Sequence, residues 1–232
     1  MYGEESLLDW AGPMLQGALV TVQIAVLAYA LGILLGLLGA SAKLSGIRSL
    51  QVGATAYSTL IRAVPELLLI ILLYYAGTQG LNALLGVLGF GGRVEITGFV
   101  AAVGVLGVVQ GAYMTEVLRG AIQAIPRGHI EAADAYGMSL WLRFRRIVVP
   151  EALPNALPGM SNLWLILVKD TALISVVGFE ELFFTAQQAA ASTRSYFIFY
   201  GAAAALYLAM TMVSNIGFRK AENVVRRGQP GV

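Results

Sequence analysis

A run without any charged side chain, from Trp10 to Ala42, constrains this chain more than any other feature of its sequence. A helix needs about 20 mostly apolar residues to cross the hydrocarbon core of a bilayer, so the run is long enough for one full span. Glu4, Glu5 and Asp9 precede it, whereas a cleavable signal peptide would begin with basic residues. We therefore predict a retained membrane helix at about 14–40.

The composition points to the same class of protein. Hydrophobic residues make up 58% of the chain and charged residues only 12%, against about 25% charged residues in a typical soluble domain. This excludes a soluble enzyme and a disordered chain, and it argues against a nucleic-acid-binding protein. With no cysteine and one histidine, thiol redox chemistry and a zinc site built on His and Cys are also excluded, and we expect no metal site.

Four further apolar segments, at about 54–78, 96–117, 154–177 and 196–218, are long enough to be membrane spans. The second is interrupted by Arg62, Pro65 and Glu66, and the fourth carries Lys169 and Asp170. The sequence thus predicts an all-α integral membrane protein in which residues 1–232 form a single transmembrane domain of five helices.

The basic residues predict the orientation of these spans. One set of loops holds Lys43, Arg48, Arg119, Arg127, Arg143, Arg145, Arg146, Arg219, Lys220, Arg226 and Arg227, whereas the other holds only Arg93 and Arg194. The sparse set also contains Glu4, Glu5, Asp9, Glu95, Glu180 and Glu181. Because Lys and Arg are retained in cytoplasmic loops, we expect the N-terminus outside and the C-terminus inside.

Small residues recur at helical spacing within the predicted spans. Gly32 with Gly36, and Gly107 with Gly111, form two GxxxG pairs. Such faces let helices approach closely in lipid, and we expect them to pack within the chain. No internal repeat is evident, which weakens the case for an inverted-repeat secondary carrier.

The segment 119–153, between the third and fourth spans, is too long for a simple turn. We predict a short helix at 129–136, ended by Gly137 as a left-handed cap, with Arg127 able to pair with Glu131. His129 has no second metal ligand near it, and we expect it to carry no chemistry.

A second short helix is predicted at 140–148, capped by Ser139 and ending before Pro150. It combines an apolar stripe with three arginines: Leu140, Phe144 and Ile147, and Arg143, Arg145 and Arg146. We interpret the helix pair as a docking element on the cytoplasmic face.

The motifs of this segment resemble those of a known family. Glu131-Ala132-Ala133, Gly137, and Ile147-Val148-Val149-Pro150 are similar to the EAA loop of ABC-importer permeases, with Val149 where the family pattern has leucine. The resemblance extends over about residues 15–218 and includes the runs 17–21, 60–65, 119–128 and 168–175. Within the family, the chain resembles the polar amino-acid permeases for histidine, lysine, arginine, ornithine and opines.

The resemblance implies that Glu131, Ala132, Ala133, Gly137, Arg143 and Pro150 couple the permease to an ATPase. Arg143, Arg145 and Arg146 would meet the ATPase or lipid phosphate. The chain lacks a G-x-x-x-x-G-K-[ST] loop, so we expect it to be a transport subunit without its own ATPase site. ATP and Mg²⁺ would be bound by separate ABC ATPase subunits. The other implied partners are an identical or homologous permease, an extracytoplasmic binding protein and the lipid bilayer of the bacterial inner membrane, with no nucleic acid.

Four ionisable side chains fall within predicted spans: Arg62, Glu66, Lys169 and Asp170. Each costs about 2.5–3.5 kcal/mol at the bilayer centre, so they must face partners, water or substrate. One interpretation is two ion pairs, Arg62 with Glu66 and Lys169 with Asp170, that only neutralise each other. The other is a substrate passage for a basic amino acid, to which Thr171 and Ser175 add hydroxyl groups.

Alternatives remain open at this point. The four charges sum to zero, so they also fit a neutral substrate such as glutamine, and the same machinery could carry acidic amino acids. A secondary carrier or channel would use the intramembrane charges to couple to an ion. An intramembrane enzyme would need a catalytic set that the spans do not contain. Glu116 and Arg119, at the inner end of the third span, are interpreted as a structural pair.

Overall fold

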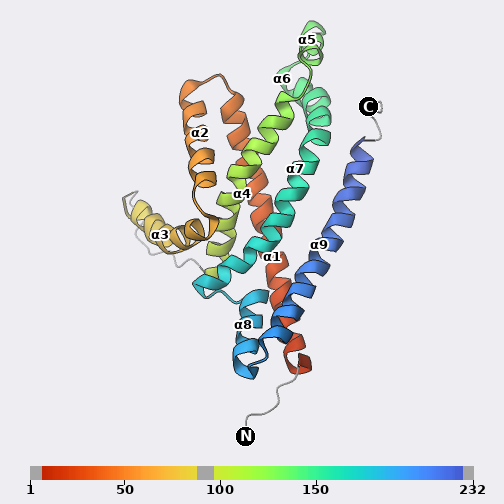
Figure 1. The fold of residues 1–232 in the computed structure, drawn as a ribbon. Coiled ribbons are helices and arrows are strands. Elements are labelled where there is room, and N and C mark those ends of the chain that lie inside the picture. Colours follow the sequence, from red (N-terminus) through yellow and green to blue (C-terminus); the bar gives the residue numbers. More distant parts are fainter. Residues whose placement is uncertain (1–6, 88–96, 227–232) are drawn as a thin grey trace.

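The computed structural model describes residues 7–87 and 97–226, and in these residues every regular element is a helix (Figure 1). Glu4, Glu5, Arg93, Glu95 and Arg227, used above to predict the orientation, lie outside the described residues, as does Ile96 at the start of the third predicted span. The elements are α1 (Leu7–Leu44), α2 (Arg48–Ala63), α3 (Glu66–Val87), α4 (Gly98–Gln123), α5 (Arg127–Ala135), α6 (Leu140–Arg143), the π turn η1 (Phe144–Val148), α7 (Val149–Asp170), the 3₁₀ helix η2 (Thr171–Val177), α8 (Leu182–Thr193) and α9 (Tyr196–Arg226).

Four helical segments of the described chain are long and apolar enough to cross a membrane: Leu8–Leu44, Gly98–Gln123, Leu140–Val177 and Tyr196–Val225. They contain the described parts of four of the predicted spans. Each helix extends several residues beyond its predicted span, because helical hydrogen bonding continues into the polar residues at the membrane surface.

The prediction of one helix over 54–78 is wrong. α2 ends at Ala63, Val64 is extended with ψ 140°, and α3 begins at Glu66 after a bend of 114°. Pro65 causes the break, because its ring disfavours the helical conformation of the preceding residue. The bend therefore separates Arg62 and Glu66, which the sequence placed one turn apart on a single helix. The two helices together provide a fifth candidate span only if the bent pair crosses as one.

The prediction that the second short helix ends before Pro150 is also wrong. Helical structure continues from Leu140 to Asp170, passing through η1, where the Val149 amide donates to the Phe144 carbonyl five residues earlier. Pro150 lies in the first turn of α7, and the wider π turn before it accommodates the missing amide.

Two smaller differences concern the other short helices. α5 spans Arg127–Ala135 rather than 129–136, and α8 was not predicted at all. The apolar and small residues of α8 had no charge pattern to set them apart from a loop. Its buried face, which includes Leu182 and Ala186, packs with Met14 of α1 and Phe199 of α9.

α1 and α4 form the centre of the bundle. Ile24 and Ala28 of α1 lie in one buried cluster with Leu106 of α4, and Ile70 and Leu167 join it from α3 and α7. The first residues of α1 and the last of α9 lie at opposite ends of the bundle, and α5 and α6 share the end of the last residues of α9 (Figure 1).

The small residues on α1 and α4 pack within the chain, as predicted. A Cβ atom added at Gly107 would lie 2.5 Å from Leu31 Cδ2, and one added at Gly36 would collide with Met114. The glycines of each helix therefore make room for larger side chains of the other helix. This arrangement brings the two backbones close together, which is what stabilises helix pairs in lipid.

Gly111→Ala should destabilise the chain by roughly 1–3 kcal/mol, because overpacking a tight contact forces neighbouring atoms to move. A Cβ at Gly111 would lie 2.7 Å from Leu35 Cβ and 2.9 Å from the Tyr57 hydroxyl oxygen. The matched control is Gly104→Ala on the same helix, since a Cβ there meets no atom within 4 Å. Thermal unfolding of the purified protein in detergent measures both, and equal losses would contradict the close-packing account.

Candidate functional site

The α5–α6 segment, residues 127–143, projects from one end of the bundle (Figure 1). Gly137 has φ +67°, and the Met138 amide donates to the Ala133 carbonyl oxygen at 3.0 Å, which closes α5 as a left-handed cap. Ser139 Oγ then accepts from the Leu142 amide at 3.3 Å and starts α6. Both predicted caps are confirmed, and together they fold the two helices into a fixed turn.

α5 has one buried face and one exposed face. Ala133 is buried at 3% exposure, whereas Glu131 and Ala132 are exposed. Within the described chain Glu131 makes no ion pair, so the predicted alternative of a salt bridge with Arg127 is not formed. A carboxylate at the free face of a projecting helix remains available to another molecule.

One ion pair and one histidine–carboxylate contact brace the α5–α6 segment at its surface. Arg143 Nη1 donates to Asp134 Oδ1, and His129 Nδ1 lies 2.7 Å from Glu151 Oε2. Arg143 therefore links α6 to α5, and His129 links α5 to the start of α7. Pro150 is exposed beside Glu151, at the base of the segment.

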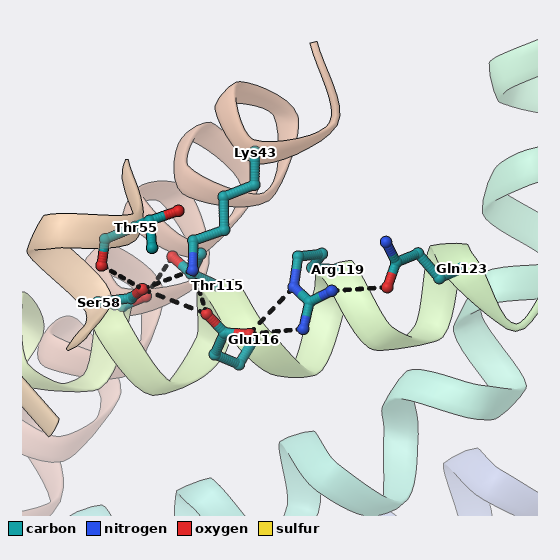
Figure 2. A network of polar contacts seen from close by, with 8 residues as sticks. Lys43, Thr55, Ser58, Thr115, Glu116, Arg119 and Gln123 are labelled. Carbon is teal, nitrogen blue, oxygen red and sulfur yellow. Dashed lines mark hydrogen bonds and ion pairs between the residues drawn. The ribbon is translucent and has the colours of Figure 1, made fainter. Parts of the chain in front are cut away.

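A polar network joins α1, α2 and α4 near the same end (Figure 2). Lys43 Nζ donates to Glu116 Oε1 and, at 2.7 Å, to Ser58 Oγ. Arg119 donates to Glu116 Oε2 through Nε at 3.0 Å and through Nη2 at 2.9 Å. Gln123 Oε1 accepts from Arg119 Nη1 at 2.6 Å and extends the network along α4. One carboxylate thus fixes the ends of three helices.

The Glu116–Arg119 pair was predicted, but Lys43 and Ser58 were not. Lys43 is the first charge after the long apolar run of α1, and it was assigned only to the basic loops. Its side chain is 10% exposed in the structure. A buried cation needs a carboxylate, and the nearest acid in a neighbouring span, Glu116, was the signal that could have identified the pair.

The intramembrane carboxyl groups of Glu66 and Asp170 come together in the fold. They lie close enough to interact, and the Tyr113 hydroxyl faces Glu66. Neither the Arg62–Glu66 nor the Lys169–Asp170 ion pair is present among the described residues. The break at Pro65 explains this for Arg62, which is exposed at the end of α2. Lys169 is within electrostatic range of Asp170, and Arg62 is within electrostatic range of Tyr113, so both cations lie in the neighbourhood of the two acids.

Lys169 lines a cavity of about 370 Å³ between η2, α8 and α9, together with Phe183, Tyr200 and Tyr207. Thr171 and Ser175 are buried in η2, where their hydroxyls donate to the carbonyl oxygens of Val168 and Ala172 at 2.8 and 2.7 Å. The six predicted path residues are therefore not one cluster: Glu66 and Asp170 are together, and the others lie around them.

Sequence reasoning missed Glu181, which was assigned to an outer loop. Its side chain is completely buried at the start of α8, where Oε2 accepts from Tyr207 Oη at 2.9 Å and from Thr21 Oγ1 at 3.1 Å. Burial raises the pKa of Glu181 above its usual range, and hydrogen bonds from the Phe183 and Phe184 amides, Tyr207 and Thr21 oppose the shift. No sequence pattern distinguished Glu181 from the neighbouring Glu180, which is exposed in the structure.

Comparisons with known proteins show which proteins this chain is similar to. Residues 29–220 match the family described as binding-protein-dependent transport system inner membrane component. The chain is 44% identical to the nopaline transport system permease protein NocQ of Agrobacterium fabrum, over 94% of this chain and 93% of that protein. It is 42% identical to the histidine/lysine/arginine/ornithine transport system permease protein HisQ of Escherichia coli, over 90% and 91%.

A solved structure shares the fold over nearly the whole chain. The crystal structure of an amino acid ABC transporter with histidines aligns with a TM-score of 0.79 and 30% identity, covering 96% of this chain and 99% of that one.

Glu116→Gln should destabilise the bundle by roughly 1–3 kcal/mol, because it leaves Lys43 and Arg119 without their counter-charge. The control is Glu180→Gln, which makes the same change at an exposed carboxylate with no partner among the described residues. Thermal unfolding in detergent measures both. Adding Lys43→Met to Glu116→Gln should recover part of the loss, and full additivity of the two losses would contradict a direct interaction.

Proposed function

This chain belongs to the family of binding-protein-dependent transport system inner membrane components, and we propose from that premise that it is the permease subunit of an ABC importer for amino acids or opines. It is a multi-pass protein of the inner membrane. The observation that carries the proposal is the α5–α6 segment, whose capped, braced helices present an unpaired Glu131 at the end of the bundle.

The proposed topology has five spans, with the bent pair α2–α3 as the second. The N-terminal end of α1 is outside and the C-terminal end of α9 is inside. The distribution of described basic residues supports this, because Lys43, Arg119 and Lys220 lie in the last two turns of α1, α4 and α9, whose C-terminal ends lie at the same end of the bundle as the α5–α6 segment (Figure 1). The segment is then cytoplasmic, where ATP is available.

In this assembly the chain pairs with an identical or homologous permease, two ATPase subunits and an extracytoplasmic binding protein. ATP and Mg²⁺ are bound by the ATPase, and ATP binding moves the α5–α6 segment. Helical structure is continuous from α6 through η1 and α7 to Asp170, so a displacement of α6 can be passed along this helix to the intramembrane carboxyl groups. The two conformations must bind ATP differently for this to drive transport.

Glu131→Lys should abolish association with the ATPase subunits, because it reverses an exposed negative charge of α5 that has no internal partner among the described residues. Co-purification of the ATPase with the tagged permease, followed by ATP hydrolysis, measures the effect. Glu180→Lys is the matched control, since it reverses an exposed charge far from the segment. Intact association of the Glu131→Lys protein would remove the docking role.

Basic amino acids and opines are the proposed substrates. Glu66 and Asp170 lie together and neither forms an ion pair within the described chain, so the cationic group of such a substrate could bind to their carboxylates. Lys169, in the cavity with Tyr200 and Tyr207, is placed to meet a carboxylate. Thr171 and Ser175 are buried next to Asp170 and would support the path rather than line it, whereas Arg62 is exposed at the end of α2. A neutral substrate such as glutamine is the second candidate, because its ammonium group also satisfies one acid.

Arginine, lysine, histidine or octopine should stimulate ATP hydrolysis by the reconstituted complex with its binding protein, and Asp170→Asn should reduce that stimulation at least about tenfold. Glu180→Gln should leave it unchanged. Stimulation by glutamine alone would keep the importer and contradict the cationic substrate. Unchanged stimulation in Asp170→Asn would remove Asp170 from the path.

A further inference from the structure

An apolar groove lies between α1, α4 and the helix that runs from η1 into α7. Its walls carry no side-chain nitrogen or oxygen, and they include Ile33, Leu37, Leu118, Ile122, Phe144 and Val148. Its volume is about 210 Å³, below the roughly 300–1,000 Å³ of pockets that hold compact small molecules. The groove therefore suits a thin, flexible, apolar chain.

The depth of the groove places it in one leaflet. Ile33 and Leu37 lie in the uncharged part of α1, about 9–15 Å before Lys43 at 1.5 Å per residue. With the orientation proposed above, this is the inner half of the bilayer, where acyl chains surround the bundle. The depth argument rests on that part of the proposed function.

Aromatic rings mark the cytoplasmic mouth of the groove. Trp141 and Phe144 stack with ring centroids 6.0 Å apart, and the Trp141 side chain is 69% exposed. Trp is enriched at the level of lipid headgroups, where its ring meets apolar chains and its N–H meets polar groups. Phe144 belongs to both the stack and the groove, so the groove opens at this level.

Two cations without internal partners among the described residues directly follow Phe144 in the chain. Arg145 and Arg146 are exposed in η1, and neither meets a carboxylate of the described chain. Arg143 in the preceding turn is paired with Asp134. The guanidinium group binds phosphate with two parallel hydrogen bonds, so this pair complements a phosphate group.

We propose that the groove binds an acyl chain of an anionic phospholipid of the inner leaflet, with its phosphate held by Arg145 and Arg146. A single lipid satisfies the apolar walls, the aromatic mouth and the unpaired cations together. The bound lipid would hold η1, which joins the α5–α6 segment to α7, against α1 and α4.

The test measures phosphatidylglycerol bound to the intact importer complex in phosphatidylcholine vesicles, by native mass spectrometry of the released complex. Arg145→Gln with Arg146→Gln should weaken binding about 30-fold, since each cation near the surface contributes roughly 1 kcal/mol and 1.36 kcal/mol is tenfold. The matched control is Arg219→Gln with Lys220→Gln, which removes two exposed cations from the same end, away from the groove.

Ala152→Leu tests the groove separately from the charges, because Ala152 is one of its half-buried lining residues. It should displace the acyl chain and lower phosphatidylglycerol binding while both arginines remain. Equal loss of phosphatidylglycerol binding in the Arg219 and Lys220 control would mean general attraction of anionic lipid and would overturn the site. Unchanged binding in the Arg145 and Arg146 variant, or in Ala152→Leu, would overturn it as well.

Two outcomes would assign the surface to a protein instead. The chain has no cysteine, so Ala152→Cys introduces a single thiol. Photo-cross-linking to a second permease from a benzophenone maleimide attached to that thiol would place that subunit at the groove. Loss of the ATPase from the Arg145 and Arg146 variant, with lipid binding intact, would assign the arginines to the ATPase. Failure of the lipid site alone would leave substrate-stimulated ATP hydrolysis unchanged and the proposed function standing.

Discussion

The close contact between α1 and α4 is the interaction on which the rest of this structure depends. Lipid tails are as apolar as leucine side chains, so burial of apolar surface cannot bring membrane helices together as it does in water. The glycines of α1 admit Gln110 and Met114, and those of α4 admit Leu31 and Leu35. This reciprocal fit fixes the register of the two helices, and α3, α7 and α8 pack against the pair.

The register of α1 and α4 also determines where the polar groups meet. It carries Lys43 to Glu116, and Ser58 of α2 completes the same network (Figure 2). At the other end α1 brings Thr21 to the buried Glu181. Each buried carboxylate is thereby surrounded by donors from several helices. A fully satisfied network of this kind specifies one arrangement, because any shift leaves a buried charge unpaired.

The sequence predicted the candidate site unevenly, for physical reasons that differ between residues. The caps at Gly137 and Ser139 depend on local backbone conformation, and both predictions were confirmed. The pairing of Arg62 with Glu66 assumed a continuous helix, and Pro65 removed that assumption. The proximity of Glu66 to Asp170 could not be predicted, because it depends on how far α3 turns at the bend. Glu181 was missed because burial of a carboxylate in a loop depends on the helices that cover it.

By itself the sequence determined that the chain is a membrane protein rather than a soluble one, roughly where its apolar helices lie, and where the motif of the α5–α6 segment lies. Hydrophobic length and local turn chemistry act over a few neighbouring residues, so they can be read along the chain. Only the tertiary structure decided that η1 joins the docking segment to α7 without a break, that Lys43 meets Glu116, and that an apolar groove opens beside Arg145. These features depend on contacts between residues far apart in the chain, which the close packing of α1 and α4 brings together.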